Sequence, residues 1–357
     1  MSAQAATPSA ASAASAASAA SAASAASAAP PLALLCGASG FIGRHIACAL
    51  RAAGWQVRPA SRRSAPAVDY TRAIHASDWQ PLLQGASAVI NAVGVLRDSR
   101  TRPMQALHAD APCALFEACA ASGVRRVIHI SALGIDGSGP AACTPYARTK
   151  RQAEERLLAL TAQGRLDGIA LRPSLVFGAG GASTRLFLAL ARLPVLALPR
   201  CAFTARVQPL AVWDLAEAVA RLAASSAASH AASHAANARP LTGLLELAGP
   251  QPLTLAAYIQ QLRASQGRPP ARALALPACI TRASARLGDA LPFSPWCTQS
   301  LHLLSADNVA SPAALPELLG RPATAPAQFM QALAAAAQAD APGVRKPQNG
   351  RDEGGAP

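Results

Sequence analysis

The sequence predicts an α/β fold in which a doubly wound, Rossmann-type parallel sheet carries helices on both faces. Short apolar runs alternate along the chain with longer segments of helical character, and a glycine-rich loop directly follows the first run. Strands that alternate with helices form parallel sheets through right-handed crossovers. The hydrophobic fraction of 52% allows a sizeable core, although aromatic residues make up only 4% of the chain.

Each element follows from an apolar run and the residues that end it. The predicted strands cover residues 32–36, 56–60, 88–95, 126–130 and 169–176. The predicted helices cover residues 42–53, 104–122 and 145–160. Gly54 ends the first helix, Thr144 can cap the third, and Pro145 suits its first turn.

Low-complexity tracts bound the folded part. Residues 1–30 are dominated by a Ser-Ala-Ala repeat and residues 341–357 are polar, so both ends are expected to be disordered. Between them, 31–340 are predicted to form an NAD(P)-binding domain with a smaller C-terminal α/β substrate lobe, mainly 174–206 and 241–335. A second Ser/Ala/His tract, 223–239, is interpreted as an inserted surface loop. Its His230 and His234 lack a third ligand, so no metal site is expected.

Charge and cysteine usage narrow the function classes. The net charge of +14 comes from scattered arginines without aromatic interleaving, which argues against a nucleic-acid partner and leaves attraction to a membrane surface open. Eight cysteines without C-x-x-C spacing favour neither metal nor disulfides and fit a reduced cytoplasmic compartment. The first cationic side chain is Arg44, and no apolar run is long enough to span a bilayer. We therefore expect a cytoplasmic protein without a secretory signal or mitochondrial transit peptide, either unattached or peripheral to the inner face of the membrane.

A dinucleotide-binding loop is predicted where the first strand runs into Gly37-x-x-Gly40-x-x-Gly43 and then a helix. Gly37 would permit the tight turn, Gly40 would let the backbone approach the pyrophosphate, and Gly43 would allow close helix packing. The helix N-terminus would bind the phosphates through free N–H groups. The cofactor contacts predicted in this loop are Gly37, Ser39, Gly40, Phe41, Ile42 and Gly43.

NADP is favoured over NAD by the residues after the second strand. An NAD site usually places a carboxylate there, whereas this chain has Arg62 and Arg63, which suit a 2′-phosphate. Both arginines could instead be solvated loop charges. Asp69 could contact the adenine ring or serve as a turn residue.

Tyr146-x-x-x-Lys150 is the candidate catalytic pair. The chain has only two lysines, and a compact ammonium one helical turn from a tyrosine can stabilise a phenolate, which guanidinium does less readily. The alternative is an exposed helical pair without a role.

In combination, these motifs resemble the short-chain dehydrogenase/reductase superfamily, in its atypical, extended branch of the NAD-dependent epimerase/dehydratase type. Within it, the chain is most similar to bacterial relatives of the dinucleotide-binding accessory subunit of respiratory complex I. The resemblance covers about residues 31–335. It rests on the glycine loop, the Tyr–Lys pair, and the segments 91–94, 129–134, 171–178, 208–219, 247–250 and 305–309.

The resemblance implies a role for each matching residue. Tyr146 would donate or accept the proton, Lys150 would hold the nicotinamide ribose and lower the tyrosine pKa, and Ser131 would orient a substrate oxygen. Asp214 would lie where the C-terminal part packs on the cofactor domain. Further cofactor contacts would come from Asn91, Ala92, Val93, Arg172 and Pro173.

One departure concerns the serine. Extended members often carry the catalytic hydroxyl one or two positions beyond Ser131, where this chain has Ala132 and Leu133. Ser131 could therefore be a cofactor-side or structural residue.

Three functions follow. The first is an NADP-dependent oxidoreductase, or an epimerase, that moves a hydride to or from a carbonyl or alcohol with Tyr146 as acid/base. The second is a non-catalytic NADP(H)-binding accessory or assembly protein of a respiratory complex, and the third is a redox sensor. The substrate would be a small molecule, and an apolar lobe would suit a lipid-like or quinone-like one. The candidate lining residues, each of which could instead be core, are Phe187, Phe203, Trp213, Phe293 and Trp296.

Overall fold

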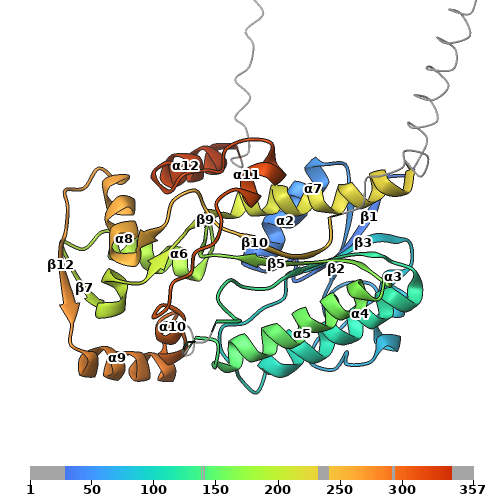
Figure 1. Ribbon diagram of the computed structural model, residues 1–357, viewed down its shortest axis with the longest axis horizontal. Helices are drawn as coiled ribbons and strands as arrows, with labels where there is room; N and C mark the ends of the chain where they lie inside the picture. The colour runs from blue at the N-terminus through green and yellow to red at the C-terminus, as the bar shows by residue number, and fades with distance from the viewer. Residues whose placement is uncertain (1–28, 138, 140, 232–240, 292–293, 340–357) are drawn as a thin grey trace, which may run out of the picture.

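A six-stranded parallel sheet forms the centre of the protein, in a computed structural model that describes residues 29–137, 139, 141–231, 241–291 and 294–339 (Figure 1). The strand order is β10-β5-β4-β3-β1-β2, and every neighbouring pair is parallel. The strands are β1 (Leu32–Cys36), β2 (Gln56–Ala60), β3 (Ala86–Asn91), β4 (Arg126–Ile130), β5 (Asp167–Pro173) and β10 (Gly243–Leu247). The predicted doubly wound α/β fold is confirmed. The two predicted disordered ends fall almost entirely outside the described residues.

Helices cover both faces of this sheet (Figure 1). One face packs against α2 (Phe41–Ala52), α7 (Val212–Ala231) and α11 (Ala314–Leu319). The other packs against α3 (Gln80–Leu83), α4 (Ala111–Ser122) and α5 (Pro145–Ala162), with short helical turns η1 (Ala76–Asp78) and η2 (Ala106–Asp110) beside them. Because the strands are covered on both sides, most of their residues are apolar. The chain reverses its direction of sheet growth at β1, which has β2 on one side and β3 on the other. Ligands bind outside the carboxyl ends of the strands at such a switch point.

The predicted bounds fail where a side chain ends a strand. The apolar run 88–95 was expected to be one strand, but β3 ends at Asn91, whose Oδ1 accepts a hydrogen bond from the backbone N–H of Val93 (3.2 Å). The run 169–176 also divides: β5 ends at Pro173, and the hydroxyl of the next residue, Ser174, bonds to Asn308. It forms β5 and the separate strand β6 (Val176–Phe177).

The interpretation of 223–239 as a surface loop is wrong for its first part, because α7 continues to Ala231. Alanine has the highest helix propensity, and the buried start of this helix supplies the nucleus that an isolated alanine-rich segment lacks. The remainder of the tract, including His234, and the side chain of His230 lie outside what the structure describes. No group of His, Cys, Asp and Glu among the described residues could hold a metal ion.

The C-terminal lobe has a core of its own, with Phe177 stacked on Phe329 at 4.6 Å between ring centroids. Phe187 packs edge-on against Tyr258 in the same core, so it belongs to the lobe interior. Three two-stranded sheets contribute: β6 with β9 (Leu210–Ala211), β7 (Val195–Pro199) with β12 (Arg272–Leu276), and β8 (Arg206–Val207) with β11 (Leu253–Thr254). The helices are α6 (Ala182–Leu190), η3 (Arg200–Phe203), α8 (Leu255–Ala264), α9 (Ala278–Ala290), α10 (Thr298–Leu303), η4 (Pro326–Gln328) and α12 (Phe329–Ala339).

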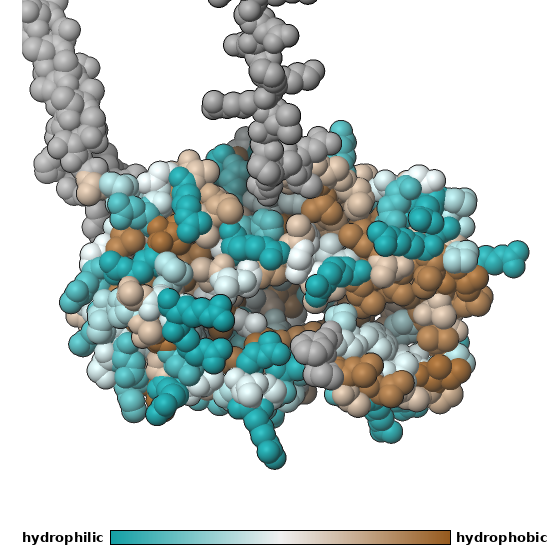
Figure 2. All heavy atoms as spheres, turned by 180° about the vertical axis from the view of Figure 1, so that it is seen from behind, coloured by the Kyte–Doolittle hydropathy of each residue, from teal (hydrophilic) through white to brown (hydrophobic). Residues whose placement is uncertain are grey.

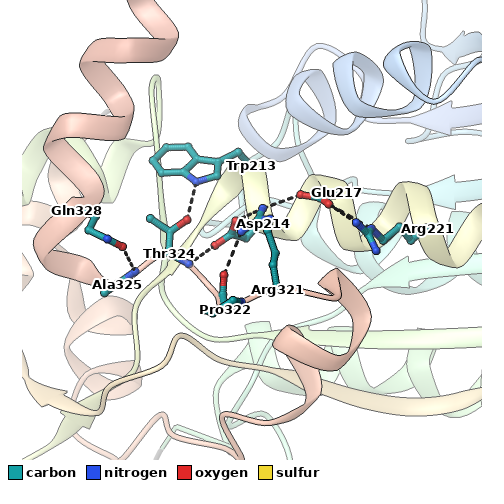
Figure 3. Close-up of polar contacts among 9 residues, drawn as sticks. All are labelled: Trp213, Asp214, Glu217, Arg221, Arg321, Pro322, Thr324, Ala325 and Gln328. Atoms are coloured by element: carbon teal, nitrogen blue, oxygen red, sulfur yellow. Dashed lines mark hydrogen bonds and ion pairs between the residues drawn. The ribbon is translucent and has the colours of Figure 1, made fainter.

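Asp214 ties the C-terminal segment to the cofactor domain (Figure 3). Its side chain is fully buried at the start of α7 and accepts hydrogen bonds from Arg321 (2.8 Å) and from the backbone N–H of Thr324 (2.7 Å). The indole of Trp213 donates to the Thr324 hydroxyl (3.0 Å). Since α7 packs on α2, this network holds the lobe against the cofactor domain. Asp214 thus lies where the resemblance implies, between the C-terminal part and the cofactor domain.

Candidate functional site

The glycine loop has the geometry of a tight turn from β1 into α2. Gly37 has φ +80°, and a Cβ there would meet the backbone of Ala92 at 2.9 Å. A Cβ at Gly43 would overlap the Gly37 carbonyl, so only glycine lets α2 begin this close to the loop. Gly40 is the N-cap of α2 and, being glycine, offers no side-chain acceptor to the first N–H groups of the helix. The first N–H groups of the helix therefore have no intrahelical acceptor and face the loop.

The two arginines after β2 are exposed. Arg62 and Arg63 lie in the turn that follows Ala60, beside the loop of the neighbouring strand β1. Asp69 accepts from the backbone N–H and the hydroxyl of Thr71 (2.9 and 2.8 Å), which together with Arg62 hold the pKa of its carboxyl below its ordinary value. Asp69 therefore forms the turn that was one of its two expected roles. Adenine contact stays a prediction.

Lys150 is buried at the carboxyl ends of β3 and β4. Its ammonium donates to the backbone carbonyls of Ile130 (2.8 Å) and Val93 (3.3 Å). Burial lowers the pKa of Lys150 to about 8, and the charge of Glu154 one turn along α5 opposes that shift. The ammonium thus stands at the switch-point edge of the sheet, next to the predicted cofactor segment Asn91–Val93.

Tyr146 begins the same helix, which Thr144 caps as predicted by accepting from the backbone N–H of Ala147 (3.2 Å). The phenol ring is half-buried and stands edge-on to the ring of His108 at 5.4 Å. Burial raises the pKa of Tyr146 to about 12. The lower tyrosine pKa that the resemblance implies is not found, because the Lys150 ammonium is turned toward backbone carbonyls.

His108 packs against Tyr146 and bonds to Thr149 in the first turns of α5. The sequence did not indicate this role. Its Nε2 accepts from the backbone N–H of Val95 (2.9 Å), so Nδ1 carries the proton and donates to the hydroxyl of Thr149 (3.1 Å). That hydroxyl donates onward to the carbonyl of Pro145 (2.9 Å). Burial and the Lys150 charge lower the pKa of His108 to about 2, so the ring is neutral. The chain of bonds fixes the first turn of α5, where Tyr146 stands.

Asn91 and His129 form a second buried pair at the ends of β3 and β4. The amide of Asn91 donates to Nδ1 of His129 (3.1 Å), which puts the imidazole proton on Nε2. That buried N–H has no partner among the described residues. Burial and the charge of Lys150 lower the pKa of His129 well below its ordinary value, so this ring is also neutral.

Ser131 follows Ile130, whose carbonyl Lys150 binds. Its hydroxyl is buried and has no hydrogen-bond partner among the described residues. A buried hydroxyl without a partner is costly, which points to a ligand group at this position. Ala132 and Leu133 occupy the next two positions, and the Leu133 carbonyl accepts from Asn308 (2.9 Å).

Asn308 also accepts from the hydroxyl of Ser174 (2.5 Å), so it joins the loops that follow β4 and β5. Asn308 lies in one of the segments on which the resemblance rests, but nothing in the sequence indicates this linking role. It became visible only when the two loops came together.

Arg172 is occupied by carboxylates. Its Nε donates to Glu154 (2.9 Å), its Nη2 makes a second bond to the same carboxylate, and its Nη1 bonds to Asp136. Burial alone would lower the pKa of the guanidinium, but these carboxylate partners raise it. The side chains of Arg172 and Glu154 are both almost fully buried. The guanidinium thus joins β5 to α5. A cofactor contact by Arg172 stays a prediction, as does one by Pro173 at the end of β5.

A cavity of about 390 Å³ adjoins the start of α5, but neither Tyr146 nor Lys150 lines it. Its walls are Asp98, Met104, Gln105, Pro145, Arg148, Thr149 and Gln152. Because neither member of the candidate catalytic pair lines this cavity, it is not assigned to the substrate.

The residues present fit a dinucleotide. The loop needs glycine at 37 and 43, the first N–H groups of α2 are available to phosphate, and the buried hydroxyl of Ser131 lacks a partner. These features lie along the switch-point edge in the order phosphate site, Asn91–Val93 and Lys150. No helix of the described part of the chain is long and apolar enough to cross a bilayer.

Sequence comparison finds a family model that covers more than half of the chain. Residues 33–237 match the model described as the NAD dependent epimerase/dehydratase family. A ceramide reductase from Caulobacter vibrioides is 28% identical over 223 residues, which span 59% of this chain and 62% of that protein. A UDP-glucose 4-epimerase from Vibrio cholerae is 25% identical over 175 residues, 42% of this chain and 53% of that protein. The matched region thus spans less than two thirds of either relative.

Solved structures share the fold at lower identity. An NADPH-dependent quinone oxidoreductase from Escherichia coli, complexed with NADPH, superimposes with a TM-score of 0.61 at 18% identity, covering 85% of this chain and 99% of that one. A UDP-glucose 4-epimerase from Thermus thermophilus in complex with NAD gives a TM-score of 0.54 at 18% identity, with 82% and 94% covered.

Proposed function

Since the chain belongs to the NAD dependent epimerase/dehydratase family, we propose that it is an NADP-dependent oxidoreductase that interconverts a carbonyl and an alcohol. The observation that carries this proposal is the convergence at one sheet edge of the Lys150 ammonium, the Tyr146 phenol on the same helix, and the unpartnered Ser131 hydroxyl. A site that only binds a dinucleotide has no need of a buried lysine beside a tyrosine. When bound, the nicotinamide supplies the hydride chemistry.

Tyr146 is proposed to donate the proton. With a pKa near 12, its phenol is protonated at neutral pH, which is the state required to protonate a carbonyl oxygen that gains a hydride on its carbon. With a pKa near 8, Lys150 keeps its positive charge at neutral pH. Its ammonium, which bonds to the carbonyls of Ile130 and Val93 at the edge of the sheet, is proposed to hold the nicotinamide ribose beside the phenol. Ser131 would hold the same oxygen through its free hydroxyl.

NADP is proposed as the preferred dinucleotide. Two exposed arginines follow β2, where a 2′-phosphate would lie, and neither makes an ion pair with a carboxylate among the described residues. Guanidinium groups bind phosphate through paired hydrogen bonds. Double substitution Arg62→Ala/Arg63→Ala should weaken NADPH binding at least tenfold in titration calorimetry and leave NADH binding unchanged. Equal losses for both dinucleotides would contradict the assignment.

An apolar carbonyl compound is the proposed substrate. The relative named ceramide reductase supports a lipid-like ketone, and the E. coli neighbour is described as acting on quinones. These are the two substrate types expected of an apolar lobe. A screen should therefore begin with long-chain ketones and quinones.

The decisive experiment compares Tyr146→Phe with Tyr258→Phe. Tyr258 is a buried tyrosine in the C-terminal lobe and makes a matched control. We expect the first variant to lose at least a hundredfold in the rate of NADPH oxidation with the best substrate of the screen, while it still binds NADPH. The control variant should keep the wild-type rate.

If Tyr146→Phe keeps full activity, the assignment of Tyr146 fails. If the wild-type protein binds NADPH tightly but none of the ketones or quinones supports NADPH oxidation, the alternative of a dinucleotide-binding accessory protein is favoured. In that case, copurification with a respiratory complex from gently solubilised cells becomes the next measurement.

A further inference from the structure

Helix α9 carries its small residues inward and its large apolar residues outward. The buried positions of α9 are Thr281, Ala285 and Gly288, which recur at helical spacing. Ile280 and Leu287 lie two turns apart on a different side of the helix and are 50% and 68% exposed. A helix that packed only for stability would turn these two side chains into the protein, so the outward face of α9 is available for another partner.

The face extends over the neighbouring strands. Strand β12 is exposed along most of its length, with Leu274 57% exposed, and it pairs with β7, whose Val195 is also exposed. We call the exposed apolar residues of this region the lobe-end patch: Leu193, Val195, Leu274, Ile280, Leu287 and Leu291. They are most of the large hydrophobic side chains exposed in the described part of the chain. β7, β12 and α9 form the end of the molecule opposite α3 and α4 (Figure 1), and Figure 2 shows hydrophobic residues gathered over this end.

The two segments that carry the patch are rich in positive charge. Six exposed arginines lie in its two segments, 192–200 and 268–291, whereas Asp289 is the one carboxylate there. None of the six forms an ion pair among the described residues, in contrast to arginines of the cofactor domain such as Arg125 and Arg172. The six are Arg192, Arg200, Arg268, Arg272, Arg282 and Arg286.

The patch is held firmly from the inside. Arg97, in the loop after β3, donates to the backbone carbonyls of Gly288 and Leu291 (both 2.6 Å) at the C-terminal end of α9. The same guanidinium reaches the carbonyl of Trp296 (3.1 Å). A cation at a helix C-terminus is also favoured by the helix dipole. The exposed face of α9 is therefore fixed in position before any partner binds.

We propose that the lobe-end patch docks the protein on a bilayer surface that contains anionic lipids. An apolar helix face bordered by arginines lies in the plane of the headgroups, with the apolar side chains inserted and the guanidinium groups on phosphate. Anionic headgroups attract each such cation. The excess of unpaired arginines over carboxylates selects anionic lipid over a neutral apolar partner. A second copy of the chain would bring the same positive charge against itself, which is unfavourable.

Vesicle sedimentation with the full chain tests the proposal. We expect binding to vesicles of phosphatidylcholine with phosphatidylglycerol, weaker at high salt, and little binding to phosphatidylcholine alone. Leu274→Ser/Leu287→Ser and Arg282→Gln/Arg286→Gln should each weaken binding on the order of tenfold. These side chains are exposed, so both variants should keep the wild-type thermal unfolding.

Matched controls use exposed residues away from the patch. Ile74→Ser/Leu244→Ser removes two apolar side chains that are 46% and 43% exposed, and Arg51→Gln/Arg72→Gln removes two exposed cations. Both controls should bind vesicles like wild type. The proposal is overturned if patch and control variants bind equally. It is also overturned if the wild-type chain does not bind anionic vesicles. In that case, a wild-type dimer that dissociates in the Leu274→Ser/Leu287→Ser variant would assign the patch to a second copy of the chain.

Discussion

The ammonium of Lys150 lies 2.8 Å from the carbonyl oxygen of Ile130, the residue before the unpartnered Ser131. This bond, with the weaker one to Val93, links α5 to the ends of two strands. It places the positive charge at the switch point before any ligand is bound. The site is thus organised by a lysine that bonds to the backbone, and the phenol one turn away stays protonated.

Lys150 should make stability rise at alkaline pH. Its pKa is about 8 in the folded protein and 10.5 as a model value, so between these values the unfolded chain binds more protons and folding gains free energy as pH increases. The Lys150→Met variant has no ammonium at this position and therefore does not gain stability in this way. The free energy of unfolding of wild type relative to the variant should therefore increase by about 2 kcal/mol between pH 8 and pH 10. Urea denaturation at both pH values measures it, and a constant difference would contradict the lowered pKa.

His108 should make the protein sensitive to acid. Its folded pKa of about 2 lies below the ordinary value of 6.5, so the unfolded chain takes up the extra proton and stability falls as pH drops below 6.5. Between pH 6.5 and 4.5, His108→Gln should lose about 2 kcal/mol less than wild type. His75→Gln, the same substitution at an exposed position, provides the control. Parallel curves for all three proteins would show that His108 is already free to titrate.

The Arg172–Glu154 pair should show strong coupling. Glu154→Leu leaves a buried guanidinium with Asp136 as its main partner, and Arg172→Met leaves a buried carboxylate without one. Each single change should cost about 3–5 kcal/mol of unfolding free energy. The double variant should cost much less than the sum of the two. Additive losses in a double-mutant cycle would mean that the two groups do not depend on each other.

Gly43→Ala should damage the cofactor loop. Its methyl group would overlap the Gly37 carbonyl, so α2 must move away from the turn that binds phosphate. We expect dinucleotide affinity to fall at least tenfold by titration calorimetry. Gly137→Ala is the control, because a Cβ there meets nothing within 4 Å and the backbone is not left-handed. Similar affinity in the two variants would exclude Gly43 as a packing contact.

Local signals predicted the elements on which the site is built. The bounds of β1, β2 and β4 agree with the apolar runs, and Thr144 caps α5 as expected. The errors fall at Asn91 and Ser174, where hydrogen bonds to other segments end a strand inside an apolar run. Apolar periodicity reports burial, and these residues stay buried after the strand has ended.

The sequence by itself determined the α/β alternation, the glycine loop and the helical Tyr146–Lys150 pair, because each depends on residues within a few positions of one another. Tertiary structure decided how the charges are used. Arg172 bonds to Glu154, 18 positions away along the chain. Lys150 bonds to the carbonyls of Ile130 and Val93, 20 and 57 positions away. His108 became the support of Tyr146. Which partner a buried charge takes depends on what the fold brings within hydrogen-bonding distance, since desolvation makes any nearby partner preferable to none.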